Sequence, residues 1–209
     1  MNEDELPAAA PRRRDATATR AAILRAAREA FTRLGYEGAG VREIARAAAV
    51  DARLIGRYFG SKEGLFAEVV DLAYEKSLMM TPEVNAQAAR ALLTEPDEAA
   101  SDGLLLTLRS ASNARAAAIM RDSIERNYQR RLADALPGRD ADGRSALLVA
   151  ICSGVLLSRM LLGSTLLNQP DVEQLVPYLR AALDAVATAP PGAAPAPAAA
   201  PADPATGGA

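Results

Sequence analysis

Two short helical patterns, separated by only three residues, constrain the fold of this chain most strongly. Apolar residues recur at helical spacing over about 41–48 and again over 52–59, and the break at Ala49-Val50-Asp51 leaves room only for a tight turn. The small residues Ala45 and Ala48 allow the two helices to cross closely and at a steep angle. The spacing therefore predicts a helix-turn-helix, with Asp51 as the N-cap of its second helix.

The composition favours helices packed on helices in the rest of the chain. Of 209 residues 48 are Ala, whereas aromatic residues make up only 4% and Trp is absent. Ala is the best helix former, and sheets prefer β-branched and aromatic side chains, so we predict an all-α fold. The first helix should start near Thr17 or Thr19 and end before Gly35. Further helices are predicted over about 61–80, 84–94, 98–111, 113–136, 142–167 and 171–188.

Composition also divides the chain into four regions. Residues 1–14 are acidic, then rich in Ala and Pro, then basic, which predicts a disordered arm. Residues 189–209 hold ten Ala, six Pro and three Gly, too little apolar area to offset the entropy of ordering, so we expect a disordered tail. Between them we predict an N-terminal three-helix helix-turn-helix domain over 15–62 and a C-terminal helical domain over 63–188.

The absence of His and the single Cys exclude several kinds of site. Zinc sites, iron–sulfur clusters and disulfide frameworks need more of these residues, and no His-based general base can exist. No paired-carboxylate motif or Gly-rich phosphate loop stands out, so we expect no metal, no cofactor, no catalytic residues and no enzyme. One Cys and an N-terminus without an apolar stretch indicate a cytoplasmic location.

The net charge of −2 conceals an uneven distribution. Residues 12–62 hold twelve Arg or Lys and five Asp or Glu, a balance of +7, whereas residues 63–209 hold twelve basic and eighteen acidic residues, a balance of −6. A basic head joined to an acidic body is typical of a nucleic-acid-binding protein. Chance clustering on solvated helices is the alternative, and charge by itself does not decide between them.

The segment over residues 19–66 resembles the DNA-binding domain of TetR-family transcriptional regulators, of the TetR/AcrR type. The matching pieces follow in order: Ile23 to Tyr36, Val41-Arg42-Glu43-Ile44-Ala45, Leu54 to Phe59 as the recognition helix, and Gly60-Ser61-Lys62-Glu63-Gly64-Leu65. The resemblance implies a helical ligand-binding and dimerisation domain after the head. It also implies a homodimer that binds a double-stranded DNA operator and responds to a small-molecule effector.

The sequence departs from the family pattern at three places. Ala49 stands at the turn where a glycine is usual, and Ala39-Gly40 stands where the second helix usually begins with Ser or Thr. Gly56 replaces a Tyr that in the family holds a DNA phosphate. This last change removes a phosphate contact, and it lets the backbone approach DNA more closely.

Two arginines on the predicted recognition helix point to base readout. Arg53 and Arg57 lie four residues apart and so share one helix face, away from Ile55 and Tyr58. Arg forms bidentate hydrogen bonds to O6 and N7 of guanine in the major groove, which is ~12 Å wide. A solvated surface pair is the alternative interpretation.

Other residues of the motif are expected to contact DNA less specifically. Lys62 would bind a phosphate at the N-terminus of the fourth helix, and the resemblance implies that Arg42 also reaches DNA. Exposed helix charges are the alternative for both, and core packing is the alternative for Tyr58. Arg12 to Arg14 would lie along a minor groove or only aid solubility. The remaining candidates, for contacts with thymine methyl groups or sugars, are Ala52, Leu54 and Gly56.

Residues 146–167 are the most apolar part of the chain. Thirteen of them precede Arg159, and an Arg in the middle of a membrane costs ~2.5–3.5 kcal/mol, so a buried helix is the simpler interpretation and we expect no membrane. With the helix over 171–188, and with the small residues Ser153 and Gly154, the segment suits a four-helix homodimer interface. Two heads ~34–36 Å apart would meet successive major grooves of a palindromic operator.

The resemblance also implies an effector site among the helices of the body. The polar candidates to line it are Arg109, Asn113, Tyr128 and Arg159, followed by Arg121 and Asn127, and for each the alternative is a surface ion pair or an internal helix contact. The leading hypothesis is a homodimeric repressor that releases its operator on binding the effector. The alternative is a regulator of the same fold that binds DNA constitutively, with no effector.

Overall fold

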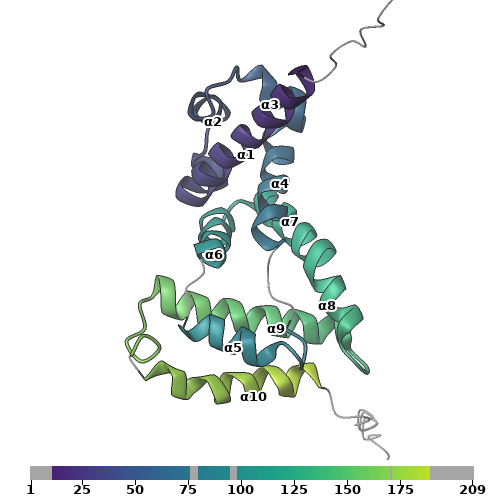
Figure 1. Ribbon diagram of the computed structural model, residues 1–209, viewed down its shortest axis with the longest axis vertical. Helices are drawn as coiled ribbons and strands as arrows, with labels where there is room; N and C mark the ends of the chain where they lie inside the picture. Colours follow the sequence, from purple (N-terminus) through teal and green to yellow (C-terminus); the bar gives the residue numbers. More distant parts are fainter. Residues whose placement is uncertain (1–10, 76–79, 95–97, 170, 189–209) are drawn as a thin grey trace, which may run out of the picture.

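The computed structural model describes residues 11–75, 80–94, 98–169 and 171–188, and throughout these ranges the chain consists of helices and the turns that join them (Figure 1). The prediction of an all-α fold is confirmed. The helices are α1 (Pro11–Gly38), α2 (Val41–Ala47), α3 (Arg53–Phe59), α4 (Lys62–Tyr74), α5 (Asn85–Thr94), α6 (Glu98–Ser110), α7 (Ala114–Ile124), the π-helical turn η1 (Glu125–Gln129), α8 (Arg130–Ala135), α9 (Ala141–Leu156), the π-helical turn η2 (Leu157–Leu161), the 3-10 turn η3 (Val172–Leu175) and α10 (Val176–Ala187).

Local signals in the sequence set several helix starts. The Asp51 carboxylate accepts a hydrogen bond from the backbone N–H of Arg53 at 2.7 Å, and so opens α3 as predicted. The Ser61 hydroxyl accepts from the backbone N–H of Gly64 at 3.1 Å and caps α4. Each bond satisfies a first-turn donor that a helix leaves without a partner of its own.

The start of α1 differs from the prediction. The helix begins at Pro11, so Thr17 and Thr19 lie inside it and do not cap it. Proline suits the first helical position, because it has no N–H to leave unbonded and its φ is already helical. Residues 11–14, expected to belong to the arm, are therefore helical. The rest of the arm, the side chains of Arg12 to Arg14 and the tail over 189–209 lie outside the described residues.

Three helices of the body also end or bend elsewhere than the periodicity predicts. The helix α4 stops at Tyr74, short of Met80. The helix expected over 113–136 contains η1, whose backbone bonds run one residue further than those of an α-helix. The helix expected to reach residue 167 stops at Leu161, because the chain turns at Gly163 with φ +61, a conformation that favours glycine.

Two hydrophobic cores hold the molecule together. The head core is formed by α1 to α4 together with Leu106 of α6 and Ala116 and Met120 of α7. The body core is formed by Met80, α5, η1, α8, α9 and α10. The packing therefore continues beyond residue 62, the expected end of the head, because α4, α6 and the first half of α7 complete the hydrophobic surface of the helix-turn-helix.

The join between α1 and α6 depends on one glycine. Gly35 has φ +71, and a Cβ at this position would collide with the backbone oxygen of Arg109 at the end of α6. The Arg109 guanidinium in turn donates to the backbone oxygen of Thr32 at 2.5 Å.

In Figure 1 the head occupies one end of the molecule, α5, α9 and α10 form a layer at the other, and α4, α7 and α8 run between them.

Candidate nucleic-acid interface

The turn between α2 and α3 is tight and leaves α3 on the outside of the head. The backbone N–H of Ala49 donates to the oxygen of Arg46 at 3.1 Å, and that of Val50 donates to the oxygen of Ala45 at 3.0 Å. Ala49 itself adopts φ +55, a left-handed conformation that favours glycine. The TetR-family pattern that the sequence resembles has glycine at this position. Ala49 adopts the left-handed backbone conformation that such a glycine would adopt.

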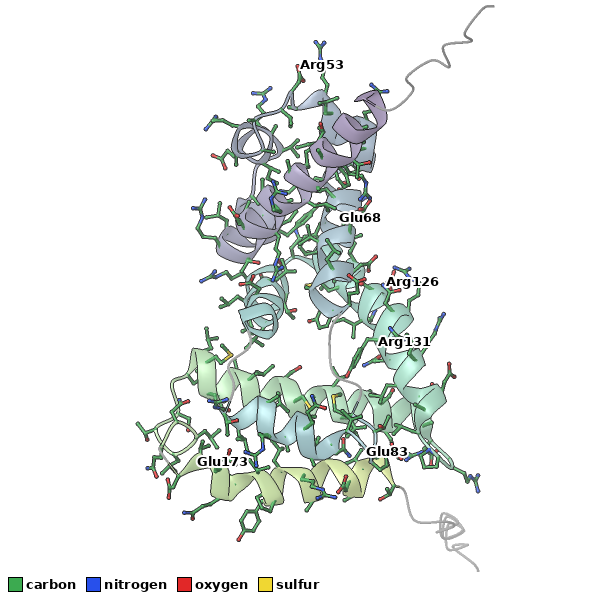
Figure 2. The ribbon with its side chains drawn as sticks, viewed as in Figure 1. Arg53, Glu68, Glu83, Arg126, Arg131 and Glu173 are labelled. Carbon is green, nitrogen blue, oxygen red and sulfur yellow. The ribbon has the colours of Figure 1, made fainter. Side chains whose placement is uncertain are left out.

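The helix α3 has one buried face and one exposed face. Ile55 and Phe59 pack into the head core, whereas Arg53, Gly56 and Arg57 are exposed. Arg53 lies at the far tip of the head, with its side chain directed away from the molecule (Figure 2). Within the described part of the chain neither arginine makes an ion pair. Both guanidinium groups are therefore available to an outside partner.

The other residues predicted to contact DNA from α3 are mostly packed against the head core. Leu54 and Tyr58 are partly buried against the head core, and so is Ala52 just before the helix. The Tyr58 ring lies edge-on to Phe59, with 6.4 Å between the ring centroids. Gly56 differs, because a Cβ there would meet no atom within 4 Å. Packing therefore does not require glycine at 56.

Basic residues flank α3 on both neighbouring helices. Arg42 is exposed in the first turn of α2, on the outside of the head. Lys62 is the first residue of α4, and its ammonium lies over the Tyr36 ring, 4.6 Å from the centroid. Such a cation–π contact fixes the direction of a long flexible side chain. The structure thus brings Arg42, Arg53, Arg57 and Lys62 into one head, on the three helices α2, α3 and α4.

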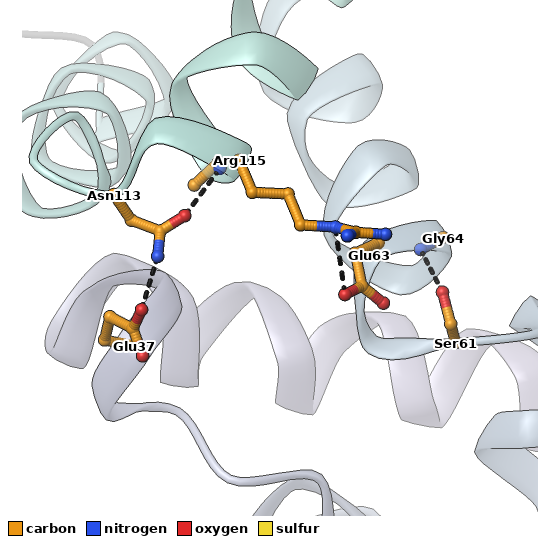
Figure 3. Close-up of polar contacts among 7 residues, drawn as sticks. Glu37, Ser61, Glu63, Gly64, Asn113 and Arg115 are labelled. Carbon is orange, nitrogen blue, oxygen red and sulfur yellow. Dashed lines mark hydrogen bonds and ion pairs between the residues drawn. The ribbon is translucent and has the colours of Figure 1, made fainter.

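The α4 N-terminus also carries the carboxylate of Glu63 (Figure 3). Glu63 Oε1 lies 3.1 Å from Nε of Arg115, a residue of α7. Hydrogen bonds from its own backbone N–H, from Ser61 and from the Tyr36 hydroxyl, together with the charge of Arg115, hold the pKa of the Glu63 carboxyl below its usual range. Burial, together with the negative charge of Glu63, raises the pKa of Tyr36. No periodicity links positions 63 and 115, so the sequence offered no signal for this pair.

Two of the predicted effector residues contact the head. Arg109 bonds the backbone of α1 through Thr32, as described above. Asn113 caps α7, where its side-chain oxygen accepts from the backbone N–H of Ala116 at 2.8 Å, and its side-chain amide donates to Glu37. Both side chains therefore have internal partners at the corner between α6 and α7.

The other two effector candidates lie in or beside the body core. Tyr128 is buried and donates to the sulfur of Met80 at 3.0 Å, and burial raises its pKa. Arg159 donates to the backbone oxygens of Leu92 and, at 3.2 Å, Leu167, and burial lowers its pKa. The four candidates do not converge on one place, and their binding of an effector stays a prediction.

The further effector candidates also have internal partners. Asn127 donates to Asp71 of α4 at 2.6 Å, and Ser123 donates to the same carboxylate oxygen. Arg121 is exposed and lies 4.0 Å from Asp122. Within the described residues no group of three or more Cys, Asp or Glu is placed to hold a metal ion.

Models of two protein families match the sequence, one over the head and the other over the body. The model described as bacterial regulatory proteins, tetR family, matches residues 23–69. The model described as tetracyclin repressor-like, C-terminal domain, matches residues 83–186. Together they span the head and most of the body. No curated protein sequence matches the chain significantly.

Solved structures have the same fold. A protein from Mesorhizobium loti assigned to the TetR-family transcriptional regulators has a TM-score of 0.55 at 20% identity, over 82% of this chain and 96% of its own. A TetR-family regulator from Streptomyces coelicolor has a TM-score of 0.51 at 24% identity, over 87% and 99%. NalD from Pseudomonas aeruginosa has a TM-score of 0.53 at 21% identity, over 81% and 96%. This chain belongs to the TetR family of bacterial transcriptional regulators, which bind DNA through a helix-turn-helix.

Proposed function

We propose that the chain is a homodimeric repressor that holds a palindromic operator through α3 and the N-terminus of α4. The observation that carries this proposal is the pair Arg53 and Arg57, which is exposed on one side of α3 while Ile55 and Phe59 anchor the other side in the head core. A short helix held on one face and basic on the other fits the major groove.

The contacts divide into base readout and phosphate binding. Arg53 and Arg57 would form bidentate bonds with guanine, whereas Arg42 and Lys62 would bind phosphates, which positions the head without reading sequence. Exposed Gly56 would allow the α3 backbone to approach DNA closely. The partly buried side chains of Ala52, Leu54 and Tyr58 would contact sugars or thymine methyl groups at the edge of the groove.

Dimerisation would use one face of the layer formed by α9 and α10. Small and apolar side chains at helical spacing are exposed there, namely Ala146, Leu147, Ala150 and Ser153 on α9 and Tyr178, Ala181, Ala182 and Ala185 on α10. Exposed apolar side chains that recur at helical spacing on two neighbouring helices favour an interaction site here. Two such helices from each protomer would form a four-helix interface.

The same apolar surface accounts for a helix with the length and composition of a membrane span. The helical segment Ala141–Leu161 is long and apolar enough to cross a membrane. Only 22% of its most apolar 18 residues are buried within one chain. Pairing with a second copy would cover the exposed part, so we infer a cytoplasmic protein and no membrane partner. Regulators of this family are generally not enzymes, and we infer the same here.

Release of DNA by a small molecule is the second part of the proposal. NalD, which has the same fold, is described as the secondary repressor of the MexAB-OprM multidrug efflux pump, which favours repression here. One observation favours the alternative of constitutive DNA binding without an effector. Arg109, Asn113, Tyr128 and Arg159 all have internal partners and lie in different parts of the molecule.

The test begins with selection of the preferred sequence from a pool of random duplexes. We expect an inverted repeat, and Arg57→Ala should lower affinity for it by roughly 10- to 100-fold and relax the preference at one base pair of each half-site. Lys62→Ala should instead weaken binding to all sequences alike. Unchanged base preference in Arg57→Ala would refute the readout assignment. Gel filtration should give a mass of two 21.9 kDa chains.

The effector is tested separately by a thermal-shift screen of small molecules. A compound that raises the melting temperature and also lowers affinity for the selected duplex supports release by an effector. Compounds that stabilise the protein without changing its affinity for DNA would favour constitutive binding.

A further inference from the structure

The N-terminus of α4 presents opposite charges side by side. Lys62 begins the helix, and Glu63 follows at once. A helix N-terminus attracts anions, and Lys62 adds a positive charge to it. A carboxylate at the next position has the opposite effect on DNA, because it repels the phosphate that this N-terminus would bind.

The carboxylate of Glu63 is held in place by neighbours in the head. Its own backbone N–H, the Ser61 hydroxyl and the Tyr36 hydroxyl donate to it, and these bonds favour the charged form. Tyr36 also carries Lys62 on its ring face, with the ammonium 4.6 Å from the ring centroid. Tyr36 therefore lies beside both charged residues of the α4 N-terminus.

The cation that pairs with Glu63 comes from α7, which packs against the head but lies outside the helix-turn-helix. Arg115 lies in the first turn of α7, and its Nε is 3.1 Å from Glu63 Oε1 (Figure 3). Asn113 at the start of the same turn bonds Glu37 of α1. The α7 N-terminus therefore contacts the head at two carboxylates, one beside the end of α1 and the other beside the start of α4.

We propose that Arg115 is a positioning residue for DNA binding, which neutralises Glu63 and so prevents this carboxylate from repelling the phosphate bound by Lys62. This inference rests on the phosphate contact assigned to Lys62 under the proposed function. It adds that affinity for DNA depends on where the first turn of α7 lies. Any movement of α7 away from α4 would leave the charge of Glu63 without its counter-ion at the DNA surface.

The pair acts on affinity and not on stability. The Arg115 side chain is 71% exposed and that of Glu63 is 32% exposed, so solvent screens their attraction and the pair adds little to the free energy of unfolding. A charge beside a bound phosphate has a larger effect, because DNA brings many negative charges to the same place. Removing Arg115 should therefore weaken DNA binding while the melting temperature stays close to that of the wild type.

The experiment measures binding to a fluorescent random-sequence duplex of about three helical turns, because phosphate contacts do not depend on sequence. Arg115→Ala should lower affinity roughly three- to tenfold. The loss should disappear in Arg115→Ala/Glu63→Gln, because there is then no carboxylate to neutralise. Arg115→Lys should retain most of the wild-type affinity. Arg126→Ala, which removes an equal charge from exposed η1, should leave affinity unchanged.

The double variant separates the proposal from its rivals. If Arg115 bound phosphate directly, Arg115→Ala would lose the same factor with Gln at position 63 as with Glu, and the proposal would be wrong. Equal losses in Arg115→Ala and Arg126→Ala would also refute it, since they would reflect net charge alone. Lys62→Ala tests the phosphate contact assigned to Lys62, on which this proposal rests. If this variant binds the duplex as the wild type does, that contact is refuted, whatever the other variants show.

Discussion

The head core and the body core differ in what they leave exposed. Six of the eight aromatic residues of the chain belong to the head core or pack against it, and Phe31, Tyr36 and Phe66 contact one another through their rings. The body core consists mainly of Leu, Ala and Val, and the region around it exposes Leu147, Leu161, Leu162, Leu166 and Tyr178. On helices that form the head core, the exposed leucines Leu34, Leu72 and Leu108 are 39–45% exposed, whereas Leu162, Leu166 and Tyr178 near the body core are 70–76% exposed. Within one chain the body therefore leaves its apolar side chains more fully exposed than the head does. This difference supports the proposal that a second copy of the chain covers the body and leaves the head free.

The largest loss of stability should come from removing a large side chain from the head core. Phe66 is fully buried, and Phe66→Ala should lower the free energy of unfolding by about 4 kcal/mol, measured by urea titration. Leu183→Ala in the body core serves as the counterpart, with an expected loss of about 3 kcal/mol. Only Leu183→Ala should regain stability as protein concentration rises, because the proposed dimer would form through the body and stabilise it. The same concentration dependence in both variants would show that the two cores unfold as one unit.

The next largest effect should come from the contact between α1 and α6. Gly35→Ala forces a left-handed backbone on alanine and drives its Cβ into the backbone of Arg109, so we expect a loss of about 3 kcal/mol. Gly143→Ala, in α9 where a Cβ meets no atom, should be neutral or stabilise by up to about 1 kcal/mol. Thermal unfolding of both variants checks this. A small effect of Gly35→Ala would mean that α1 and α6 can separate without cost.

A smaller effect is expected on the exposed face of the body. Leu147→Glu places a charge in the proposed dimer interface and should raise the dimer dissociation constant roughly 30-fold, or about 2 kcal/mol. Leu72→Glu is the matched control on α4, since Leu72 is exposed to a similar degree. Analytical ultracentrifugation measures both. An equal rise of the dimer dissociation constant in both variants would show that the exposed face of the body is no more important for dimerisation than that of the head.

The smallest effect concerns the turn of the helix-turn-helix. Ala49 has φ +55 and is exposed, so Ala49→Gly should stabilise the protein by about 1 kcal/mol through relief of backbone strain. Circular dichroism during heating measures the shift, and the affinity for DNA should stay the same. A loss of stability would show that alanine is not strained at this turn.

The features that were predicted correctly depend on residues close together in the sequence. Asp51 accepts a hydrogen bond from the N–H of Arg53, two residues further on, and such a bond follows from local sequence alone. Helical periodicity likewise identified Ile55 as a buried residue and left Arg53 and Arg57 on the exposed side of α3. The prediction for α1 was wrong at its start, because helical propensity continues upstream of Thr17 to Pro11.

Sequence was enough to predict that the chain is helical, where the helix-turn-helix lies and which of its arginines are exposed, because helical periodicity and capping bonds act within one or two turns. Which distant helices share a core, and which charges meet, depends on how the helices pack. This packing brought Arg115 of α7 to Glu63 of α4, and Asn127 of η1 to Asp71, across 52 and 56 positions. Such pairs form wherever packing brings two helices together, and the spacing of residues along the chain does not specify that geometry.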